Sequence, residues 1–513
     1  MVFPVVGGTQ DTSYEIENSL RTGGGDNHHL SMVYSSSASD ANRRKFTFSG
    51  WIKLGQAAHF TEYYDDEKYL LTSTDAAVST THIGYGGYTS GNAGGFFLGD
   101  GRSGTYIETT TKFRDPSAWY HLVVKYDSTQ STASDRIFIY VNGESQGLNY
   151  SNTGDPEVDL NTTVDFFLAG DDVDATSADS GNFVHNINSY MNSGFGAINN
   201  SFDGYMADWY LLDGQALAPT EFAETNDNGV WVPKKYTGTF NSHSFHLEFK
   251  QTGSSANSSG IGADTSGQDN HFKVGVNSTL AAVDITTDTP TNNFATLNPI
   301  DTNSNHTFSE GNCKIVYSAS AGTFGVTKAT MGVAKGKWYW EVKYTYGNAG
   351  QFGVFDVNDT LSNTSDIYTE AGNSTFEGLG WRIDSSNNIK EVGEGQQADT
   401  NVDFSSGNIL GIAFDADNGK IYAYNNGTEL TSQDISAGTS LITALTVSDF
   451  FLPFISNGDG GSGTKTGTSE INFGNPTFSI SSGNSDANGY GNFEYAVPSG
   501  YYALCTKNLA EFG

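Results

Sequence analysis

Short runs of alternating or doubly apolar residues, separated by Gly, Asn, Ser and Asp, extend along the whole chain. In residues 407–430 (GNILGIAFDADNGKIYAYNNGTEL), apolar side chains occupy both faces of an extended segment at 409–414. This pattern is typical of a strand buried on both sides. Residues 415–419 and 425–427 then carry the Asp, Asn and Gly that tight turns favour. The stretch therefore predicts the centre of an antiparallel sandwich.

The first half of the chain shows the same alternation. Residues 46–54 (FTFSGWIKL), 119–126 (WYHLVVKY) and 136–141 (RIFIYV) predict strands, and Asn142-Gly143 after the third predicts a hairpin turn. One short helix start is visible, at 218–222. Because long amphipathic helices are hard to find, we predict an all-β protein made of two antiparallel β-sandwiches in series.

The length of 513 residues suggests two to four domains. Residues 1–236 are predicted to form the first sandwich and 305–480 the second. Between them, 237–304 is rich in Ser, Asn, Thr and Gly and predicts a polar connector, with a strand near 244–250 that could pair back to the first domain. Residues 481–513 predict a C-terminal segment that packs on the second sandwich.

Both sandwiches resemble known domain families. The first resembles concanavalin A-like jelly rolls of the laminin-G and pentraxin type, and the second resembles SPRY-type domains. The motifs of the first are FTFSGWIKL (46–54), WYHLVVKYD (119–127), RIFIYVNGE (136–144) and FDGYMADWYLLDGQAL (202–217). Those of the second are residues 407–430 together with GKWYWEV (336–342), QFGVF (351–355), GW (380–381), FLPF (451–454) and INFG (471–474).

Further segments resemble structural proteins of marine tailed phages (cyanophage-like), which pair a laminin-G-like domain with a SPRY-like one. They are WVPKKY (231–236), DTSGQDN (264–270), TDTPTNNFATLN (287–298) and ALCTKNL (503–509). The resemblance implies a tail-fibre or surface component of the virion, in contact with other virion proteins. It implies homo-oligomers, with a trimer favoured, whose loops bind a host surface glycan or dock a neighbouring subunit. The alternatives are a glycan-degrading tail depolymerase or a bacterial surface adhesin.

Charge and hydropathy limit the partners. Lys and Arg total 25 against 58 Asp and Glu, so the net charge is 25 − 58 = −33. Such a surface repels nucleic-acid phosphates and anionic membranes, and we predict binding to neither. The start MVFPVVGG has no basic signal-peptide region, and no apolar run approaches about 18 residues. We therefore expect no membrane insertion, and release by cell lysis, as for a part of a virion.

The sequence predicts that the protein is not an enzyme. Retaining β-glucanases of the concanavalin-like fold need two carboxylates about 5–5.5 Å apart, which E-x-D-x-E supplies on one strand. The nearest match, Glu157-Val-Asp159-Leu-Asn161, ends in an amide and lies in a loop-like stretch. No G-x-S-x-G, Walker loop or H-E-x-x-H is present. His121 lies in a predicted strand and is expected to be packed rather than catalytic.

Two sets of residues are candidate ligand sites. Asp171, Asp172 and Asp174 offer hard oxygen ligands for Ca²⁺, with a metal-free acidic loop as the alternative, and we predict no other cofactor. Sugar contact is expected from tyrosines in polar or Gly-rich stretches, with ordinary loop-tip tyrosines as the alternative. These tyrosines are Tyr63, Tyr64, Tyr85, Tyr88 and Tyr190.

Six tryptophans and the two cysteines are expected inside the protein. Cys313 and Cys505 cannot form a framework of several disulfides, and neither has a second Cys or His at zinc-ligand spacing. They are predicted to be buried thiols, with a single bridge between them as the alternative. Six tryptophans lie within strand patterns and are predicted to be core residues: Trp51, Trp119, Trp209, Trp338, Trp340 and Trp381.

Overall fold

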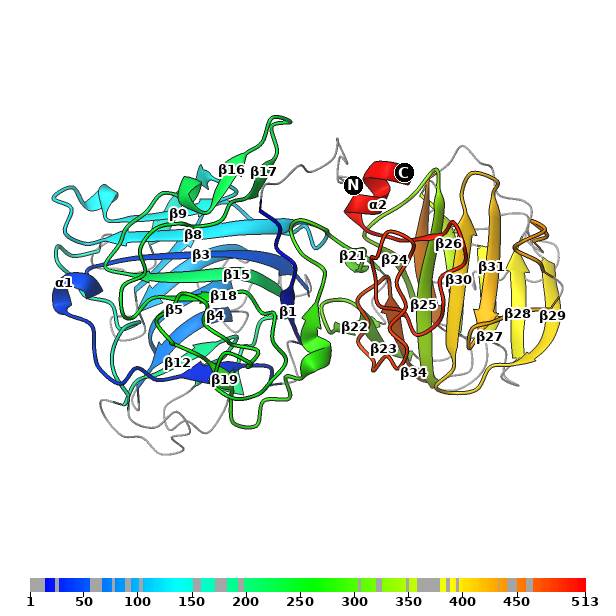
Figure 1. Cartoon of the computed structure of the whole chain (residues 1–513), viewed down its shortest axis with the longest axis horizontal. Helices are drawn as coiled ribbons and strands as arrows, with labels where there is room; N and C mark the ends of the chain where they lie inside the picture. The colour runs from blue at the N-terminus through cyan, green and yellow to red at the C-terminus, as the bar shows by residue number, and fades with distance from the viewer. Residues whose placement is uncertain are drawn as a thin grey trace. The chain divides into compact units, whose positions relative to one another are not determined.

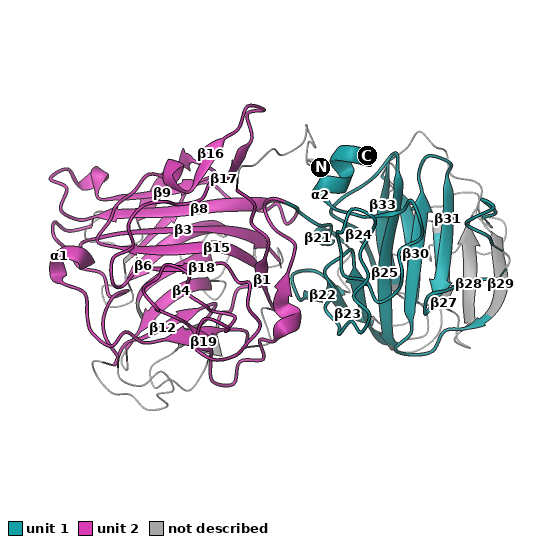
Figure 2. Ribbon diagram, in the orientation of Figure 1, with its two compact units in different colours: residues 1–9, 292–513 teal, residues 10–291 magenta. Residues whose placement is uncertain are grey.

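The chain forms two compact units (Figures 1 and 2). Unit 2 comprises Gln10–Thr291, and unit 1 comprises Asn292–Gly513 together with Met1–Thr9. The computed structural model describes residues 14–23, 27–55, 67–75, 79–87, 94–100, 105–150, 158–170, 182–191, 198–302, 306–319, 325–346, 350–357, 379–383, 388–393, 396–431, 433–440, 450–457 and 465–513.

Unit 2 is a sandwich of two eight-stranded sheets. Sheet A has the order β10 (Glu144–Ser145), β9 (Ile137–Val141), β8 (Trp119–Asp127), β3 (Lys45–Leu54), β15 (Gly204–Asp213), β1 (Ser19–Thr22) and β20 (Ile285–Thr286), and β18 (Phe245–Leu247) also pairs with β15. Sheet B has the order β11 (Leu148–Tyr150), β7 (Thr105–Thr109), β6 (Gly95–Asp100), β5 (Ser79–Gly86), β4 (Lys68–Thr74), β12 (Val184–Ile187), β2 (Leu30–Met32) and β19 (Lys273–Val274). All these pairings are antiparallel, as the sequence predicts.

Smaller elements complete unit 2. They are the hairpins β13 (Tyr190–Met191) with β14 (Ile198–Asn199) and β16 (Ala223–Thr225) with β17 (Trp231–Pro233), the helix α1 (Asp40–Arg43), and the 3₁₀ turns Ala133–Asp135, Pro219–Glu221 and Ala282–Asp284. The turn at Pro219–Glu221 confirms the predicted helix start. Proline is well placed there, because its fixed φ suits the first helical position and its missing N–H has no helical partner to lose.

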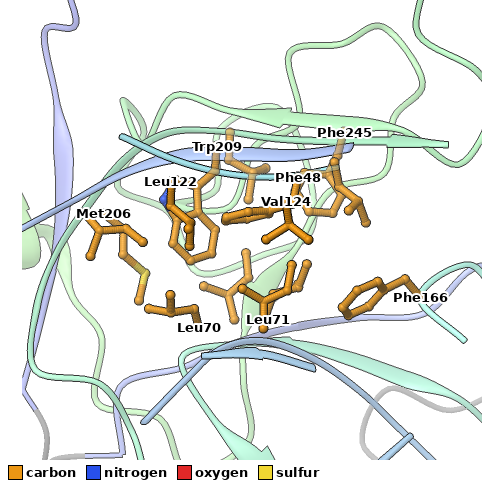
Figure 3. Close-up of a cluster of buried hydrophobic side chains, with 14 of the residues drawn as sticks. Phe48, Leu70, Leu71, Leu122, Val124, Phe166, Met206, Trp209 and Phe245 are labelled. Carbon is orange, nitrogen blue, oxygen red and sulfur yellow. The ribbon is translucent and has the colours of Figure 1, made fainter. Parts of the chain in front are cut away.

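The core of unit 2 lies between the two sheets (Figure 3). Alternate residues of sheet A, such as Phe48, Leu122 and Trp209, point toward Leu70 and Leu71 of β4, and all five are at most 1% exposed. This is the alternation seen in the sequence, with every second side chain of a strand directed inward.

The predicted connector differs from what the structure contains. Instead of a linker over 237–304, β18 adds to sheet A, β19 to sheet B and β20 to β1, so unit 2 extends to Thr291. Strand β18, within the stretch 244–250, pairs with β15 of the first sandwich. The end of this segment is held by a buried ion pair, in which Lys53 Nζ lies 2.7 Å from Asp288 Oδ2. Polar residues of the segment are therefore interior residues.

Unit 1 is a second sandwich of antiparallel sheets. Sheet C has the order β21 (Leu297–Thr302), β24 (Gly325–Ala329), β33 (Phe451–Asn457), β26 (Gly350–Asp356), β27 (Leu379–Ile383), β28 (Asn388–Gly393) and β29 (Gln396–Asp403). Sheet D has the order β22 (His306–Ser309), β23 (Lys314–Ala319), β34 (Lys465–Asn472), β25 (Lys337–Tyr346), β30 (Ile409–Asp415), β31 (Lys420–Asn425) and β32 (Thr428–Glu429). A short parallel strand, β35 (Tyr502–Ala503), also pairs with β25, and the helix α2 (Thr506–Phe512) follows it.

The stretch 407–430 forms the predicted hairpin, but not at the centre of its sheet: β30 and β31 lie toward one edge of sheet D, where only the two-residue strand β32 follows them. Strand β30 is buried at all seven positions and pairs with β31 on one side and β25 on the other. The turn after β31 places Asn426 at φ 48° and Gly427 at φ 77°, the left-handed conformations that these two residue types tolerate best.

The C-terminal segment covers the outer face of sheet D. Phe493 and Tyr501 are buried in a cluster with Tyr339 of β25 and Tyr422 of β31. Glu341 of β25 holds the segment, because its two carboxylate oxygens accept the backbone N–H groups of residues 494 and 495 at 3.0 and 2.8 Å. They also accept the Asn472 side chain at 3.2 Å and the Tyr339 hydroxyl at 3.3 Å.

Two further predictions about the interior are confirmed, those for the tryptophans and for the cysteines. The six tryptophans predicted to be core residues are all at most 8% exposed. Cys313 and Cys505 are free and buried. In the part of the chain that the structure describes, no helix is long and apolar enough to cross a membrane.

Candidate functional site

The outer face of sheet A is occupied by the protein's own segments. Trp51, Trp119 and Tyr205 on this face are buried in a cluster with Ile16 and Ala223. Farther along β15, three more aromatic residues pack together: Tyr210, Phe222 and Tyr236. The outer face of sheet B carries a different set of side chains.

The strand register places a continuous row of side chains on that face. Directly paired residues share a face, and the pairs run from Tyr106 (β7) to Gly99 (β6), His82 (β5), Thr72 (β4) and Asn186 (β12). We call these five residues the outer row. A neighbouring row on the same face consists of Glu108, Phe97, Gly84 and Tyr69.

Four rings of these two rows form an aromatic cluster on the sheet. The centroid of the His82 ring lies 5.1 Å from that of Tyr69, 5.1 Å from that of Tyr106 and 5.9 Å from that of Phe97. The ring of His82 lies against the backbone of β6, because a Cβ at Gly99 would be 2.0 Å from His82 Nε2. Glycine at position 99 therefore makes room for the imidazole.

Polar atoms of the outer row are buried without partners. His82 is 1% and Asn186 0% exposed, and neither ring nitrogen of His82 nor Nδ2 of Asn186 has a hydrogen-bond partner among the described residues. Burial lowers the pKa of His82 to about 3, so its imidazole is neutral at ordinary pH. A buried donor left unpaired costs about 1–3 kcal/mol, so such groups call for a specific explanation.

Two carboxylates lie beside the rings. Glu67, which precedes β4, accepts a hydrogen bond from the Tyr69 hydroxyl, and burial together with this carboxylate raises the pKa of Tyr69 well above its usual value. Glu108 is fully buried in the row next to the outer row. The arrangement thus offers ring faces, neutral donors and acceptors, and acidic groups, but the outer row itself carries no charge.

The structure describes two of the tyrosines that are predicted to contact sugar, Tyr85 and Tyr190. Tyr85 was expected in a Gly-rich loop, and that placement is wrong: it lies in β5, is 6% exposed and donates its hydroxyl to the Phe113 carbonyl at 2.7 Å. Its ring packs on Phe96 inside the sandwich. Tyr190 begins β13, and its side chain lies outside what the structure describes.

The other candidates lie outside the described residues and stay predictions. They are the sugar-contact candidates Tyr63, Tyr64 and Tyr88 and the calcium candidates Asp171, Asp172 and Asp174. Of the pair considered for glycosidase chemistry, Glu157 also lies outside. Asp159 lies in an exposed turn in which its carbonyl accepts the Thr162 hydroxyl at 3.0 Å, so it does not project from a strand.

His121 is packed, as the sequence predicts. Its Nδ1 accepts the indole N–H of Trp231 at 3.1 Å, and its Nε2 lies 2.9 Å from the hydroxyl of Ser49. Its ring stacks on Trp51, with centroids 4.8 Å apart. Burial lowers its pKa to about 3, which leaves a neutral ring fixed by two hydrogen bonds.

A second polar chain links Thr265, His246 and Asp208. His246 Nδ1 lies 2.9 Å from the Thr265 hydroxyl, and His246 Nε2 lies 2.7 Å from Asp208 Oδ1. The order resembles that of a hydrolytic triad, but Asp208 also accepts the hydroxyls of Tyr14 and Tyr210 at 3.0 and 3.2 Å. Because this chain ties three separated segments together, we assign it to stability.

Sequence reasoning missed the outer row. His82 sits in the run Thr-His-Ile-Gly-Tyr, whose alternation identifies a strand but gives no sign of its neighbours. Asn186 is about a hundred residues away along the chain and joins His82 only through the register of β4. In β12 (Val-His-Asn-Ile) the two polar residues are consecutive, so no local pattern marks Asn186 as a residue of the same face as His82.

The chain is similar to one protein family and to several solved structures. Residues 24–183 match the family described as the concanavalin A-like lectin/glucanases superfamily, as expected for the first sandwich. No curated protein matches the chain. Similar solved structures include the SPRY domain of human HERC1 (16% identity, 34% of this chain and 96% of that one, TM-score 0.25). They also include a heptameric SAP-like pentraxin from Limulus polyphemus (16%, 40% and 81%, TM-score 0.27) and the TRIM65 PSpry domain (15%, 35% and 91%, TM-score 0.26). Unit 2 thus contains a concanavalin A-like domain, and SPRY domains are among the structural neighbours of the chain.

Proposed function

We propose that this chain is a non-enzymatic structural protein of a virus particle and that its concanavalin A-like unit binds carbohydrate. The observation that carries the binding proposal is the outer row, where polar atoms of His82 and Asn186 have no hydrogen-bond partner among the described residues. The rings of Tyr69, Phe97 and Tyr106 lie beside the His82 ring. Sugars match such a surface, since their C–H faces stack on rings and their hydroxyls both donate and accept hydrogen bonds. Apolar lining with a few placed polar groups is typical of ligand sites.

The virion role is supported by the sequence. Four separate segments, at 231–236, 264–270, 287–298 and 503–509, resemble structural proteins of marine tailed phages. In that setting the protein would lie at the tail or capsid surface, against other virion proteins, as a homo-oligomer with a trimer favoured. Several copies on one particle would convert weak contacts with a host glycan into firm attachment. A net charge of −33 would keep such an assembly soluble.

Binding of the purified full chain to an array of microbial and algal glycans tests the carbohydrate proposal. We expect binding to at least one oligosaccharide, without release of sugar on prolonged incubation. Failure to bind any glycan on the array or any host polysaccharide would contradict it, and sugar release would contradict the non-enzymatic role.

Electron microscopy of virions labelled with antibody against this chain tests the location. Label is expected at the tail or capsid surface. Particles that carry the gene but take no label would rule out the structural role, whatever the glycan array shows.

A further inference from the structure

We infer that Tyr34, His185 and His243 form an acid-sensitive latch that closes one end of the sandwich of unit 2 and opens before the sandwich unfolds. The latch requires no ligand, so it goes beyond the proposed carbohydrate binding. Its evidence is the position of the three rings, the groups that they bind and the charges that face them.

The three rings lie near the ends of strands from both sheets. His185 of β12, in sheet B, is directed inward, because Ile187 two residues farther on belongs to the core. Tyr34 follows β2 of sheet B, and His243 precedes β18 of sheet A. The centroid of the Tyr34 ring lies 4.9 Å from that of His185 and 5.0 Å from that of His243. The tyrosine thus joins a histidine of sheet B to one beside sheet A.

The latch holds residues 34–38 against residues 167–170. Two backbone hydrogen bonds join these segments, with the N–H groups of residues 38 and 170 as donors at 2.9 and 3.0 Å. Exchange of these two amides with solvent deuterium therefore reports whether the segments are in contact.

His243 is placed to carry a proton on both ring nitrogens. Its Nε2 lies 2.7 Å from the Ser36 carbonyl, which only accepts hydrogen bonds. Its Nδ1 lies 3.4 Å from Asp213 Oδ2, at the end of β15, and 3.1 Å from the Ser242 hydroxyl, which can also accept. The hydrogen bond to Asp213 raises the pKa of His243, so the charged ring is stabilised there.

His185 is placed to stay neutral. It is 2% exposed, and its Nε2 donates to the Leu168 carbonyl at 2.9 Å. Burial, together with the nearby His243, lowers the pKa of His185 to about 4. Among the described residues no carboxylate forms an ion pair with it, so a proton on this ring would add a second positive charge beside His243 without its own anion.

The other titratable groups at the latch do not supply that anion. Burial and the charges of Asp213 and Asp264 raise the pKa of Tyr34 well above its usual value, so its hydroxyl stays protonated and donates to the His243 carbonyl at 2.7 Å. Asp213 already faces His243. The oxygens of Asp264 accept three backbone N–H groups. One imidazolium is therefore matched by a carboxylate, and a second is not.

Acid should open the latch. In the open form His185 takes up a proton near pH 6.5, whereas in the closed form it does so only near pH 4, so acid favours the open form by up to about tenfold per pH unit between these values. His243 has the opposite sign, because its pKa is raised in the closed form. Its stabilisation is complete below pH 6.5 and is lost only as the pH rises through its folded-state pKa. The closed latch is thus most stable near pH 6.5.

Hydrogen exchange of the full chain, followed by mass spectrometry from pH 7.5 to pH 4.5 and corrected for the intrinsic effect of pH, tests the latch. Protection of the amides of residues 38 and 170 should fall about fivefold from pH 6 to pH 5. At every pH these amides should be less protected than those of β3 and β8, because the latch opens locally. Protection that is constant with pH, or equal to that of β3 and β8, would overturn the inference.

Substitutions of His185 assign the effect. His185→Gln keeps an N–H donor for the Leu168 carbonyl but cannot take up a proton, so protection of the two amides should change less than about twofold from pH 6 to pH 5. His185→Phe keeps a ring beside Tyr34 and should give the same nearly flat profile, which provides a second variant if the first folds poorly.

The matched control is His306→Phe in unit 1, another buried histidine whose pKa is lowered to about 3. It should keep the pH response of the parent protein. A response in the His185 variants as steep as in the parent, or a flat response in the control, would overturn the assignment to His185. Because no sugar is present in these measurements, either outcome leaves the carbohydrate proposal standing.

Discussion

Replacing Asp288 by alanine should destabilise unit 2 strongly, because it removes the carboxylate from a buried ion pair. The side chains of Lys53 and Asp288 are 0% and 1% exposed, with 2.7 Å between Nζ and Oδ2. Asp288 Oδ1 also accepts the indole N–H of Trp119 at 3.2 Å. The substitution therefore leaves an interior ammonium without this anion and an indole without this acceptor.

The expected loss in the free energy of unfolding follows from the burial of this ion pair. Removing one partner of a buried pair costs about 3–5 kcal/mol, whereas an exposed ion pair contributes under about 1 kcal/mol. The chain offers a matched exposed pair, in which Lys250 Nζ lies 3.3 Å from Glu17 Oε2 with side chains 39% and 67% exposed. Glu17→Ala is the control. The double variant Lys53→Met/Asp288→Leu should recover most of the loss, because it replaces both charges by apolar groups.

Urea unfolding of the full chain, followed by tryptophan fluorescence, measures the effect as a change in midpoint at constant m-value. Because the ion pair of Lys53 with Asp288 lies inside unit 2, we expect a chain that ends at residue 291 to fold as a stable sandwich. A chain that ends at residue 236 lacks Asp288 and should not. If Asp288→Ala shifted the midpoint no more than Glu17→Ala, the assignment of residues 282–291 to the interior of unit 2 would be refuted.

Three further outcomes are expected. Unit 2 should lose stability as the pH falls below 6.5, because His121 has a folded-state pKa of about 3 and only the unfolded chain binds its proton between these pH values. Each such histidine lowers the free energy of unfolding by roughly 1.4 kcal/mol per pH unit, which urea unfolding at a series of pH values measures. A free energy of unfolding that stays constant from pH 6.5 to 4 would contradict this. Glu341→Gln should loosen the C-terminal segment, because a single side-chain oxygen then serves the four donors that two carboxylate oxygens serve now. Hydrogen exchange at the backbone amides of residues 494 and 495 should become faster. Exchange as slow as in the parent protein would contradict this. Cys505, whose pKa burial raises to about 12, should react with a thiol reagent only on unfolding, as should the buried Cys313; fast labelling of the native chain would refute the packing.

Alternation along the chain predicted much of the fold. The run at 46–54 became β3 (Lys45–Leu54), and the stretch 407–430 became the hairpin of β30 and β31. These segments are predictable because each strand buries a fixed set of side chains whatever strand lies beside it. Two-faced apolar character further placed β30 in the interior of its sheet.

The boundary near 237–304 was harder to predict because composition misleads there. Asp284, Asp288 and Thr291 look like linker residues, yet each is at most 3% exposed. Their polarity is used inside the fold, where Thr291 donates to the Ile16 carbonyl at 2.8 Å and Asp288 pairs with Lys53. A polar residue that is paired across more than two hundred positions has no local signature in the sequence.

Whether buried polar atoms have partners within the chain also decides how the outer row should be interpreted. Lys53 and Asp288 are buried and paired, so their cost of desolvation is offset within the chain, and breaking the pair should only destabilise. His82 and Asn186 are buried with atoms that no described residue satisfies, so removing His82's nitrogens should cost the fold nothing and can stabilise it by about 1–3 kcal/mol. A site shaped for stability would not respond in this way. A His82→Phe variant that is as stable as the parent, or more so, and binds sugar more weakly would therefore identify the row as built for a ligand, because stability and affinity would have moved independently.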